Sequence, residues 1–439
     1  MNARTLLVTG LALFAMYFGA GNLIFPVMIG IEAGGSLTPA ITGFIITGVI
    51  LPVLGMVAAA TAPEGVEQIA DRIGHRPGVV FTIIIFLSTG VAYAIPRVAS
   101  VAYEMVVAPS FDSGWAGQAA FLAVFFLVTY LLAINPKGLL DRIGGLLTPV
   151  LLAFLFALIL AAIITLPIER GPAAGDYAGE PLAAGLINGY FTMDAIASLV
   201  FGIVIISSLR RRGLTGRSLF TGTALAGIIA GIALTAVYLG LAAVGARLGG
   251  GGMTNGAEAL AHASELVFGR AGQLIFGIIV LLACLTTAVG LTGASTQYFR
   301  TLLPQVGRVP MMISHVCIAF LLANLGLDAI LAVVAPVNQL IYPVAICLIL
   351  VSLLGLGLRG RLWWSYRLTC WTAAVFGLLE ALRSTGRADA LDHVLDPLPL
   401  GAVHLPWAAP ALLALTIGLT LDLRRSPAKL TGRAERTHA

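Results

Sequence analysis

The chain consists of one long apolar stretch after another, separated by short polar gaps, and this pattern restricts what it can fold into. Of its 439 residues, 59% are hydrophobic and only 10% are charged, which is far from the composition of soluble domains. A helix needs about 20 mainly apolar residues to cross a hydrocarbon core of roughly 30 Å. The sequence therefore predicts an all-α integral membrane protein in which the membrane domain fills almost the whole chain.

The apolar stretches, divided at glycines, prolines and charged residues, predict twelve transmembrane helices. Six fall in the first half of the chain and six in the second. The predicted spans are 5–30, 38–61, 78–108, 117–135, 143–166, 182–209, 217–247, 272–303, 309–325, 327–357, 361–383 and 405–423.

The basic residues indicate how these spans are oriented. With the N-terminus inside, nineteen of the 25 lysines and arginines fall on the cytoplasmic side, five fall outside, and Arg97 lies within the third span. Short cytoplasmic loops accumulate positive charge. We therefore expect a multi-pass protein of the cell (inner) membrane with both termini in the cytoplasm. The net charge of +5 follows from this topology and indicates no nucleic-acid partner.

Enzymatic and metal-dependent classes find little support in the sequence. All four cysteines lie in apolar stretches, without the spacing of a disulfide framework or a zinc site. An intramembrane aspartyl protease needs two carboxylates that share a proton, but Asp194 has no second aspartate at comparable depth. The glycines at 19 and 21 lack the full pattern and the strand context of a dinucleotide loop. We expect no enzyme and no cofactor.

Two predicted spans contain residues that interrupt helices. The first carries Gly19 and Gly21 in its middle, followed by Pro26, and the sixth carries glycines and polar residues over 185–194. Interrupted spans at matching positions in two halves are typical of inverted-repeat transporters. The predicted division is a first repeat at 1–166, a second at 167–357, two further helices at 358–425, and a cytoplasmic tail at 426–439.

Unwound segments at membrane depth provide specific chemistry. Free backbone amides at the N-terminus of a half-helix can hold a carboxylate, and free carbonyls can hold a cation or an ammonium group. An amino acid carries both groups. Glycines in membrane helices also serve close helix packing, so packing is the alternative explanation for each glycine taken singly.

Three motifs resemble signatures of a known family. They are Phe-Gly-Ala-Gly-Asn-Leu-Ile-Phe-Pro at 18–26, Ala-Ile-Pro-Arg at 94–97 and Gly-Tyr-Phe-Thr-Met-Asp at 189–194. The chain resembles the bacterial branched-chain amino acid:cation symporters, within the amino acid–polyamine–organocation superfamily. The resemblance implies the leucine-transporter type of fold, a five-plus-five inverted repeat with discontinuous helices 1 and 6. It also implies sodium-coupled uptake of leucine, isoleucine and valine.

The same resemblance implies a sodium site between the first break and the eighth span. The implied ligands are three backbone carbonyls and two hydroxyls, and no buried formal charge is required. They are the carbonyls of Ala15, Phe18 and Ala283 and the hydroxyls of Thr286 and Thr287. The alternative is that both threonines bond to their own helix backbone.

Candidate substrate-binding residues cluster around the breaks and the third span. Asp194 could receive the substrate ammonium, hold a second cation with Asn22 and Thr192, or pair with Arg97, because ionisable groups within the membrane are usually functional. Arg97 could contact the substrate carboxylate, lock a gate, or act as a strut. The full candidate set is Gly19, Ala20, Gly21, Asn22, Tyr93, Arg97, Phe191, Thr192 and Asp194.

Several alternatives remain open at this point. Coupling could use protons through Asp194, the cargo could be another small zwitterion, and the chain could be a transporter-like channel or nutrient sensor. An apolar pocket separates leucine, isoleucine and valine poorly, because one methylene changes binding by roughly 1–3 kcal/mol. The pattern specifies no oligomeric state.

Overall fold

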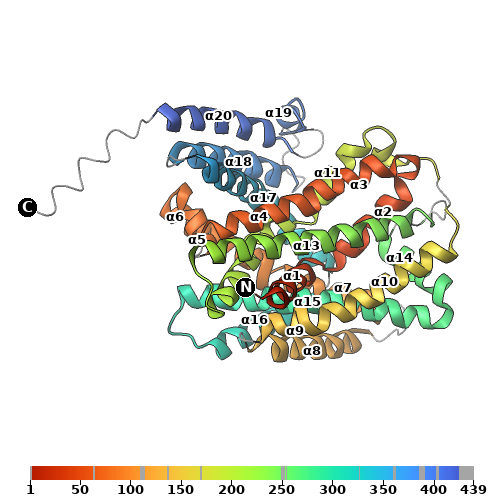
Figure 1. Cartoon of the computed structure of the whole chain (residues 1–439). Helices are drawn as coiled ribbons and strands as arrows, with labels where there is room; N and C mark the ends of the chain where they lie inside the picture. The colour runs from red at the N-terminus through yellow and green to blue at the C-terminus, as the bar shows by residue number, and fades with distance from the viewer. Residues whose placement is uncertain are drawn as a thin grey trace, which may run out of the picture. The chain divides into compact units, whose positions relative to one another are not determined.

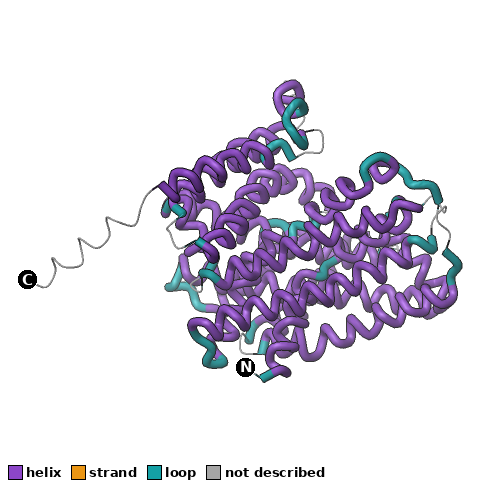
Figure 2. Tube along the Cα trace, turned by 45° about the horizontal axis from the view of Figure 1, so that its top comes forward, coloured by secondary structure: helices purple, strands orange, loops and turns teal. Residues whose placement is uncertain are grey.

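In the part of the chain that the structure describes, every regular element is a helix. The computed structural model describes residues 2–62, 65–108, 114–135, 138–168, 171–248, 253, 255–325, 327–358, 362–384, 391–401 and 405–424. Figure 2 shows helices joined by loops, with no strand among these residues. The all-α prediction is confirmed.

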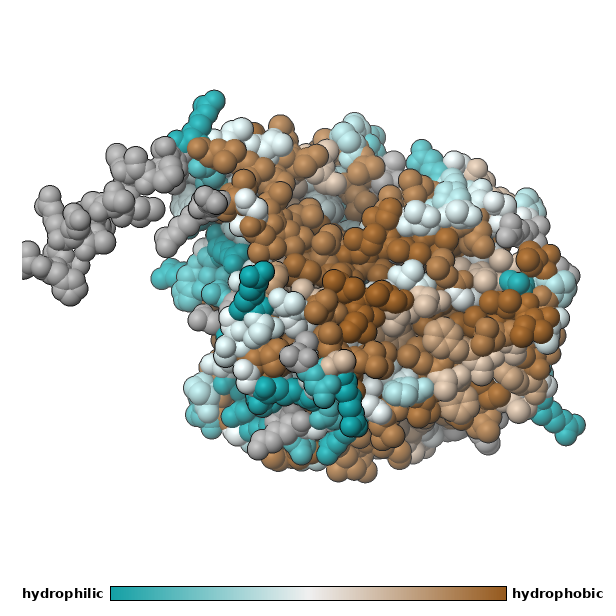
Figure 3. Space-filling view, viewed as in Figure 1, coloured by the Kyte–Doolittle hydropathy of each residue, from teal (hydrophilic) through white to brown (hydrophobic). Residues whose placement is uncertain are grey.

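The described helices are apolar enough for a membrane. Eight of them are long and hydrophobic enough to cross one, and nine are if the bent pair formed by the first two helices counts as a single span. Brown apolar side chains cover most of the face in Figure 3. Leu127, Ile164 and Ile232 are among the large apolar residues that remain exposed. The chain is therefore a multi-pass membrane protein.

Each of the twelve predicted spans coincides with helix in the described residues, but the count of twelve membrane crossings stays a prediction. The ninth span corresponds to a shorter apolar helix. The predicted junction near Gly326 and the tail at 426–439 lie outside the described residues. The sequence analysis also missed the helix Gly256–Phe268, between the seventh and eighth predicted spans, and the short helices Val66–Ala70 and Asp392–Leu395.

The chain forms two compact units, which are described separately. The first unit comprises Met1–Gly65 and Ile85–Val334. Most of its helices are labelled in Figure 1. Those that lie wholly within the unit are α1 Ala3–Tyr17, α2 Ala20–Glu32, α3 Leu37–Ile45, α4 Leu51–Ala60, α7 Ala94–Val106, α8 Gly114–Ala133, α9 Leu139–Arg142, α10 Thr148–Thr165, α11 Pro181–Phe191, α12 Asp194–Arg211, α13 Gly216–Gly245, α14 Gly256–Phe268, α15 Gly272–Leu302 and α16 Arg308–Ala323.

Short 3-10 and π segments extend or join several helices of the first unit. The π segments lie in the second, third and fifth predicted spans, which the sequence analysis treated as continuous α-helix. The 3-10 segments are η1 Gly34–Ser36, η6 Gly175–Ala178 and η7 Gly269–Ala271, and the π segments are η2 Ile46–Ile50, η4 Leu87–Val91 and η5 Ile143–Leu147.

The second unit comprises Val66–Ile84 and Ala335–Ala439. It contains α5 Val66–Ala70, η3 Asp71–Ile73, α18 Trp363–Arg383, α19 Asp392–Leu395 and α20 Ala408–Arg424, with most of α6 His75–Phe86 and α17 Leu327–Gly357. In this unit α18 packs along α20. The Asp422 carboxylate accepts hydrogen bonds from the Trp364 and Ser365 amides, at 3.0 and 2.9 Å, and so caps the start of α18.

The two interrupted helices of the first unit pack in a reciprocal way. Both α1 and α2, on either side of the first break, pack along α13. Both α11 and α12, on either side of the second break, pack along α3–α4. Glycine pairs allow these close approaches: a Cβ on Gly245 would lie 2.0 Å from the Val27 carbonyl oxygen, and one on Gly185 would lie 1.9 Å from that of Ala40. The breaks are therefore held against long, uninterrupted stretches of helix.

Two neighbouring glycines in η5 test how tightly α1 is held. A Cβ on Gly144 would lie 2.0 Å from the Val8 carbonyl oxygen of α1, whereas a Cβ on Gly145 meets nothing within 4 Å. We expect Gly144→Ala to push α1 away and destabilise the protein by about 2 kcal/mol. Gly145→Ala should be close to neutral. Each variant is solubilised in detergent and heated, and the temperature at which its monodisperse peak is lost measures its stability. Equal temperatures for the two variants would contradict this packing.

Candidate functional site

The first helix is broken at the predicted place. Helix α1 ends at Tyr17, α2 begins at Ala20, and the two halves meet at an angle of 71°. Gly19 is extended, with ψ at −172°, and caps α2 without a side-chain hydrogen bond. The positive end of the α2 dipole, with its first amides, therefore meets the negative end of α1 at one point.

The sixth predicted span is interrupted at the end of the stretch 185–194. Helix α11 runs through Gly185 and Gly189, and the break lies at Thr192 and Met193. Met193 has a left-handed backbone, with φ at 60° and ψ at 17°, which is uncommon for a residue with a side chain. The expectation that these two glycines unwind the helix is wrong, because they pack α11 against α3 and η2 instead.

A buried polar network joins the two breaks. The Asn22 amide, in the first turn of α2, donates to the Asp194 carboxylate at 2.7 Å. The same amide nitrogen lies 2.5 Å from the hydroxyl of Tyr238 on α13. Asp194 is the first residue of α12, where the helix dipole favours a negative charge, and only 4% of it is exposed. The Thr192 hydroxyl donates to the Gly189 carbonyl at 2.8 Å and also interacts with Asp194.

Arg97 lies beside the start of α2. A Cβ built on Gly21 would lie 3.7 Å from the Arg97 Nη2. The Arg97 Nη1 donates to the Tyr93 hydroxyl at 2.8 Å, so the tyrosine, which caps α7, orients the guanidinium. Among the described ion pairs, none joins Arg97 to a carboxylate. The structure therefore places Arg97 at the amide end of α2 and does not pair it with Asp194.

Four of the five predicted cation ligands, Ala15, Ala283, Thr286 and Thr287, meet near the end of α1. The Ala15 carbonyl accepts hydrogen bonds from the hydroxyls of Thr286 and Thr287, at 2.9 and 3.4 Å. The Thr286 hydroxyl shares its proton with the Ala283 carbonyl of its own helix, at 3.0 Å. A Cβ on Gly19 would lie 3.4 Å from the Thr287 Oγ1, so the chain just after Phe18 faces the same threonine.

This oxygen cluster suits a hard monovalent cation. Its oxygens are carbonyls and hydroxyls, and it lies at the negative end of the α1 dipole. In the described residues no group of three or more histidine, cysteine or acidic side chains could hold a metal ion. A transition-metal centre is therefore not indicated by these residues.

The remaining candidates are placed less centrally. Phe191, the last residue of α11, is 36% exposed and packs edge-on against Tyr190, so it lies at the rim of the break. Ala20 begins α2, and its side chain is not described.

Sequence reasoning missed Tyr238 and Tyr17. Tyr238 is fully buried, and both tyrosines lie within electrostatic range of the Asp194 carboxylate. The available signal was a hydroxyl in the middle of an apolar span. The sequence analysis also missed the interruption of the third span at Ala92 and Tyr93. Just before it, Gly90 has non-helical backbone angles, and a Cβ on this glycine would lie 2.9 Å from the Ser295 Oγ.

Comparison with known proteins identifies the family of the chain. The family model described as branched-chain amino acid transport protein matches residues 2–425. The branched-chain amino acid permease BrnQ of Corynebacterium glutamicum is 40% identical over 435 residues, covering 99% of each chain. The branched-chain amino acid transport system 2 carrier protein of Pseudomonas aeruginosa is 38% identical, covering 95% of this chain and 96% of the relative.

One solved structure shares the fold. It is that of Mhp1, a nucleobase-cation-symport-1 family transporter in a closed conformation with bromovinylhydantoin bound. The TM-score is 0.60 at 16% identity, with 96% of this chain and 93% of that chain covered. At this identity the likeness concerns the fold alone.

The family match and the names of the relatives define a membrane transporter, and not an enzyme, and the fold with its two broken helices is consistent with this class. The chain belongs to the branched-chain amino acid transport protein family, as the resemblance of its motifs predicted.

Proposed function

We propose that this protein carries leucine, isoleucine and valine into the cell by alternating access, with sodium as the coupling ion. The observation that carries the coupling is the convergence of both α15 hydroxyls on the Ala15 carbonyl at the first break. A cation bound to these oxygens would tie α1 to α15 and so order the unwound segment. The names of the relatives support the cargo.

The polar groups around the breaks suit the two ends of an amino acid. The amides at the start of α2 and the Arg97 guanidinium would hold the substrate carboxylate. Asp194, held by Asn22, would receive the ammonium group or help hold a second cation. Phe191 and Tyr93 would border the aliphatic side chain, with Gly19 and Gly21 leaving the backbone accessible.

We further propose the architecture of twelve spans with a five-plus-five inverted repeat and both termini in the cytoplasm. The packing of the first broken helix on α13 and of the second on α3–α4 supports the repeat, because each interrupted helix contacts the second helix of the opposite half. The distribution of lysine and arginine supports the orientation.

Proton coupling is the second candidate mechanism. Asp194 is buried and accepts a hydrogen bond from Asn22, and the described ion pairs give it no cationic partner. A carboxylate in this setting is chemically able to carry a proton through a transport cycle. Another small zwitterion as cargo would use the same carboxylate and ammonium contacts.

Arg97→Lys tests the carboxylate contact. Lysine keeps the charge but loses the planar fork that both meets Tyr93 and approaches Gly21. We expect the half-saturating leucine concentration to rise about 10-fold or more at fixed sodium, because a charge-assisted hydrogen bond contributes about 1.5–3 kcal/mol. Tyr93→Phe, which only frees the guanidinium, should have a smaller effect. An unchanged leucine dependence in Arg97→Lys would remove Arg97 from the substrate site.

Binding by the purified protein tests the proposed cargo and ion together. Labelled leucine should bind in sodium chloride and be displaced by unlabelled isoleucine and valine. Binding should fall sharply in potassium or choline chloride at the same ionic strength. Binding that is equal in all three salts would argue against the sodium site, and binding that rises only at acid pH would favour proton coupling.

A further inference from the structure

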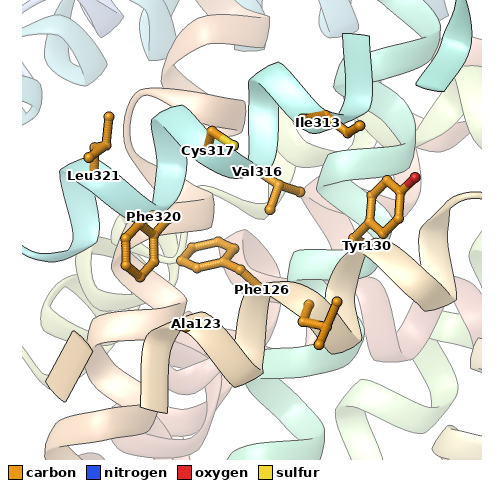
Figure 4. A pocket seen from close by; sticks show the side chains of 9 residues that line it. Ala123, Phe126, Tyr130, Ile313, Val316, Cys317, Phe320 and Leu321 are labelled. Atoms are coloured by element: carbon orange, nitrogen blue, oxygen red, sulfur yellow. The ribbon is translucent and has the colours of Figure 1, made fainter. Parts of the chain in front are cut away.

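A groove between α8 and α16 lies outside the transport site. It has a volume of about 490 Å³, within the usual range for ligand pockets of about 300–1,000 Å³. Figure 4 shows aromatic and aliphatic side chains from the two helices lining it. Tyr130 and Ile313 lie toward one end, and Phe320 and Leu321 toward the other. The groove is therefore apolar and runs along α8 and α16.

Arginines gather at the Tyr130 end of this groove. Arg308, the first residue of α16, donates to the carbonyls of Ile134 and Ala133, both at 3.1 Å. Arg142 donates to the Leu132 carbonyl at 3.0 Å. Both side chains thus cap the C-terminus of α8, about one turn beyond Tyr130.

These arginines lack an acidic partner among the described residues. Arg308 lies within electrostatic range of Arg300 and Arg211, so like charges are brought together. None of the described ion pairs involves Arg142, Arg300 or Arg308. Asp141, the acidic residue next to Arg142, is paired with Arg212 at 2.8 Å. The arginine cluster, which consists of Arg142, Arg300 and Arg308, therefore carries excess positive charge at one end of an apolar groove.

We propose that this groove binds an anionic phospholipid, with an acyl chain between α8 and α16 and the phosphate at the arginine cluster. A soluble anion would contact the arginines but would leave the apolar groove unfilled. A neutral lipid would fill the groove but would not balance the charge of the arginines. An anionic phospholipid matches both features. The start of α16 adds its own amides, since Gly307 caps the helix without a side-chain hydrogen bond. In the proposed orientation the cluster faces the cytoplasmic leaflet, where such basic sites bind anionic headgroups.

Native mass spectrometry of the whole protein tests the proposal without measuring transport. The protein is incubated with equal amounts of phosphatidylglycerol and phosphatidylethanolamine in neutral detergent. We expect phosphatidylglycerol adducts to predominate, and Arg300→Gln to reduce them about five-fold. Ala123→Trp, which fills the groove, should abolish them. The matched controls are Arg217→Gln, an exposed arginine at the start of α13, and Ile232→Trp, an exposed apolar position on the same helix.

Cys317 provides a second measurement. It lines the groove and is the exposed one of the chain's four cysteines. Phosphatidylglycerol should slow its alkylation by N-ethylmaleimide in the unmodified protein and in Arg217→Gln, but much less in Arg300→Gln. Equal protection by phosphatidylethanolamine, protection by inorganic phosphate alone, or adducts that survive both Arg300→Gln and Ala123→Trp would overturn the proposal. Because neither readout depends on uptake, these results stand apart from the proposed function.

Discussion

Asp194→Asn is expected to lower the ratio of maximal uptake to half-saturating leucine concentration by about 100-fold or more. Asp194 is buried at the second break, and it accepts a hydrogen bond from Asn22, which lies at the first break. Removing one member of a buried, hydrogen-bonded charge pair costs about 2–5 kcal/mol. In the proposed site the lost pair is the one between this carboxylate and either the substrate ammonium or a second cation.

Asparagine is nearly the same size as aspartate, so this substitution changes charge more than packing. Asp176→Asn, an exposed acidic residue of η6, provides the control and should transport normally. Measuring uptake across pH separates the two mechanisms: proton coupling predicts that Asp194→Asn also loses the pH dependence of the unmodified protein. Normal uptake by Asp194→Asn would leave the residue with a packing role only.

Thr286→Val is expected to raise the half-saturating sodium concentration by about 10- to 100-fold. The hydroxyl is one of two that converge on the Ala15 carbonyl, and valine replaces it with a methyl group of similar shape. An interaction between a polar oxygen and a full charge contributes about 1.5–3 kcal/mol. The relative competition of isoleucine and valine against leucine should not change, because the proposed cation site is separate from the side-chain pocket.

The controls for this substitution lie on the same helix. Thr292→Val removes another buried hydroxyl of α15 that is not bonded to Ala15 and should leave sodium activation intact. Thr286→Ser keeps a hydroxyl and should recover most of the sodium response. A Thr286→Val protein with unaltered sodium activation would show that the threonine hydroxyls only bond backbone carbonyls of their own and the neighbouring helix, as hydroxyls in membrane helices often do.

The sequence predicted the breaks because glycine, proline and asparagine are conspicuous within apolar helices. It placed the first break correctly, since Gly19 is the extended residue between the two halves. The second break lies within the predicted stretch 185–194, but at its end, because Gly185 and Gly189 stay helical and serve packing against α3 and η2. The actual break depends on Met193 adopting a left-handed conformation that tertiary contacts, and not methionine itself, impose.

The proposed cation site and the polar network differ in how far the sequence predicted them. Thr286 and Thr287 were found by their position relative to the family motifs, and the structure brings them to Ala15. Tyr238 was missed because a single aromatic residue in an apolar helix is indistinguishable from packing until its neighbours are known. The interruption at Tyr93 was missed for a similar reason, because the role of Gly90 becomes clear only once its close contact with Ser295 is known.

The most direct test of the central claim is accumulation of labelled leucine in proteoliposomes under an imposed inward sodium gradient. A proton gradient and no gradient are the two controls, and isoleucine and valine are added as competitors. The sodium-coupled account predicts accumulation above the equilibrium level with the sodium gradient alone, suppressed by both competitors. Accumulation driven only by the proton gradient, or none under any gradient, would contradict it.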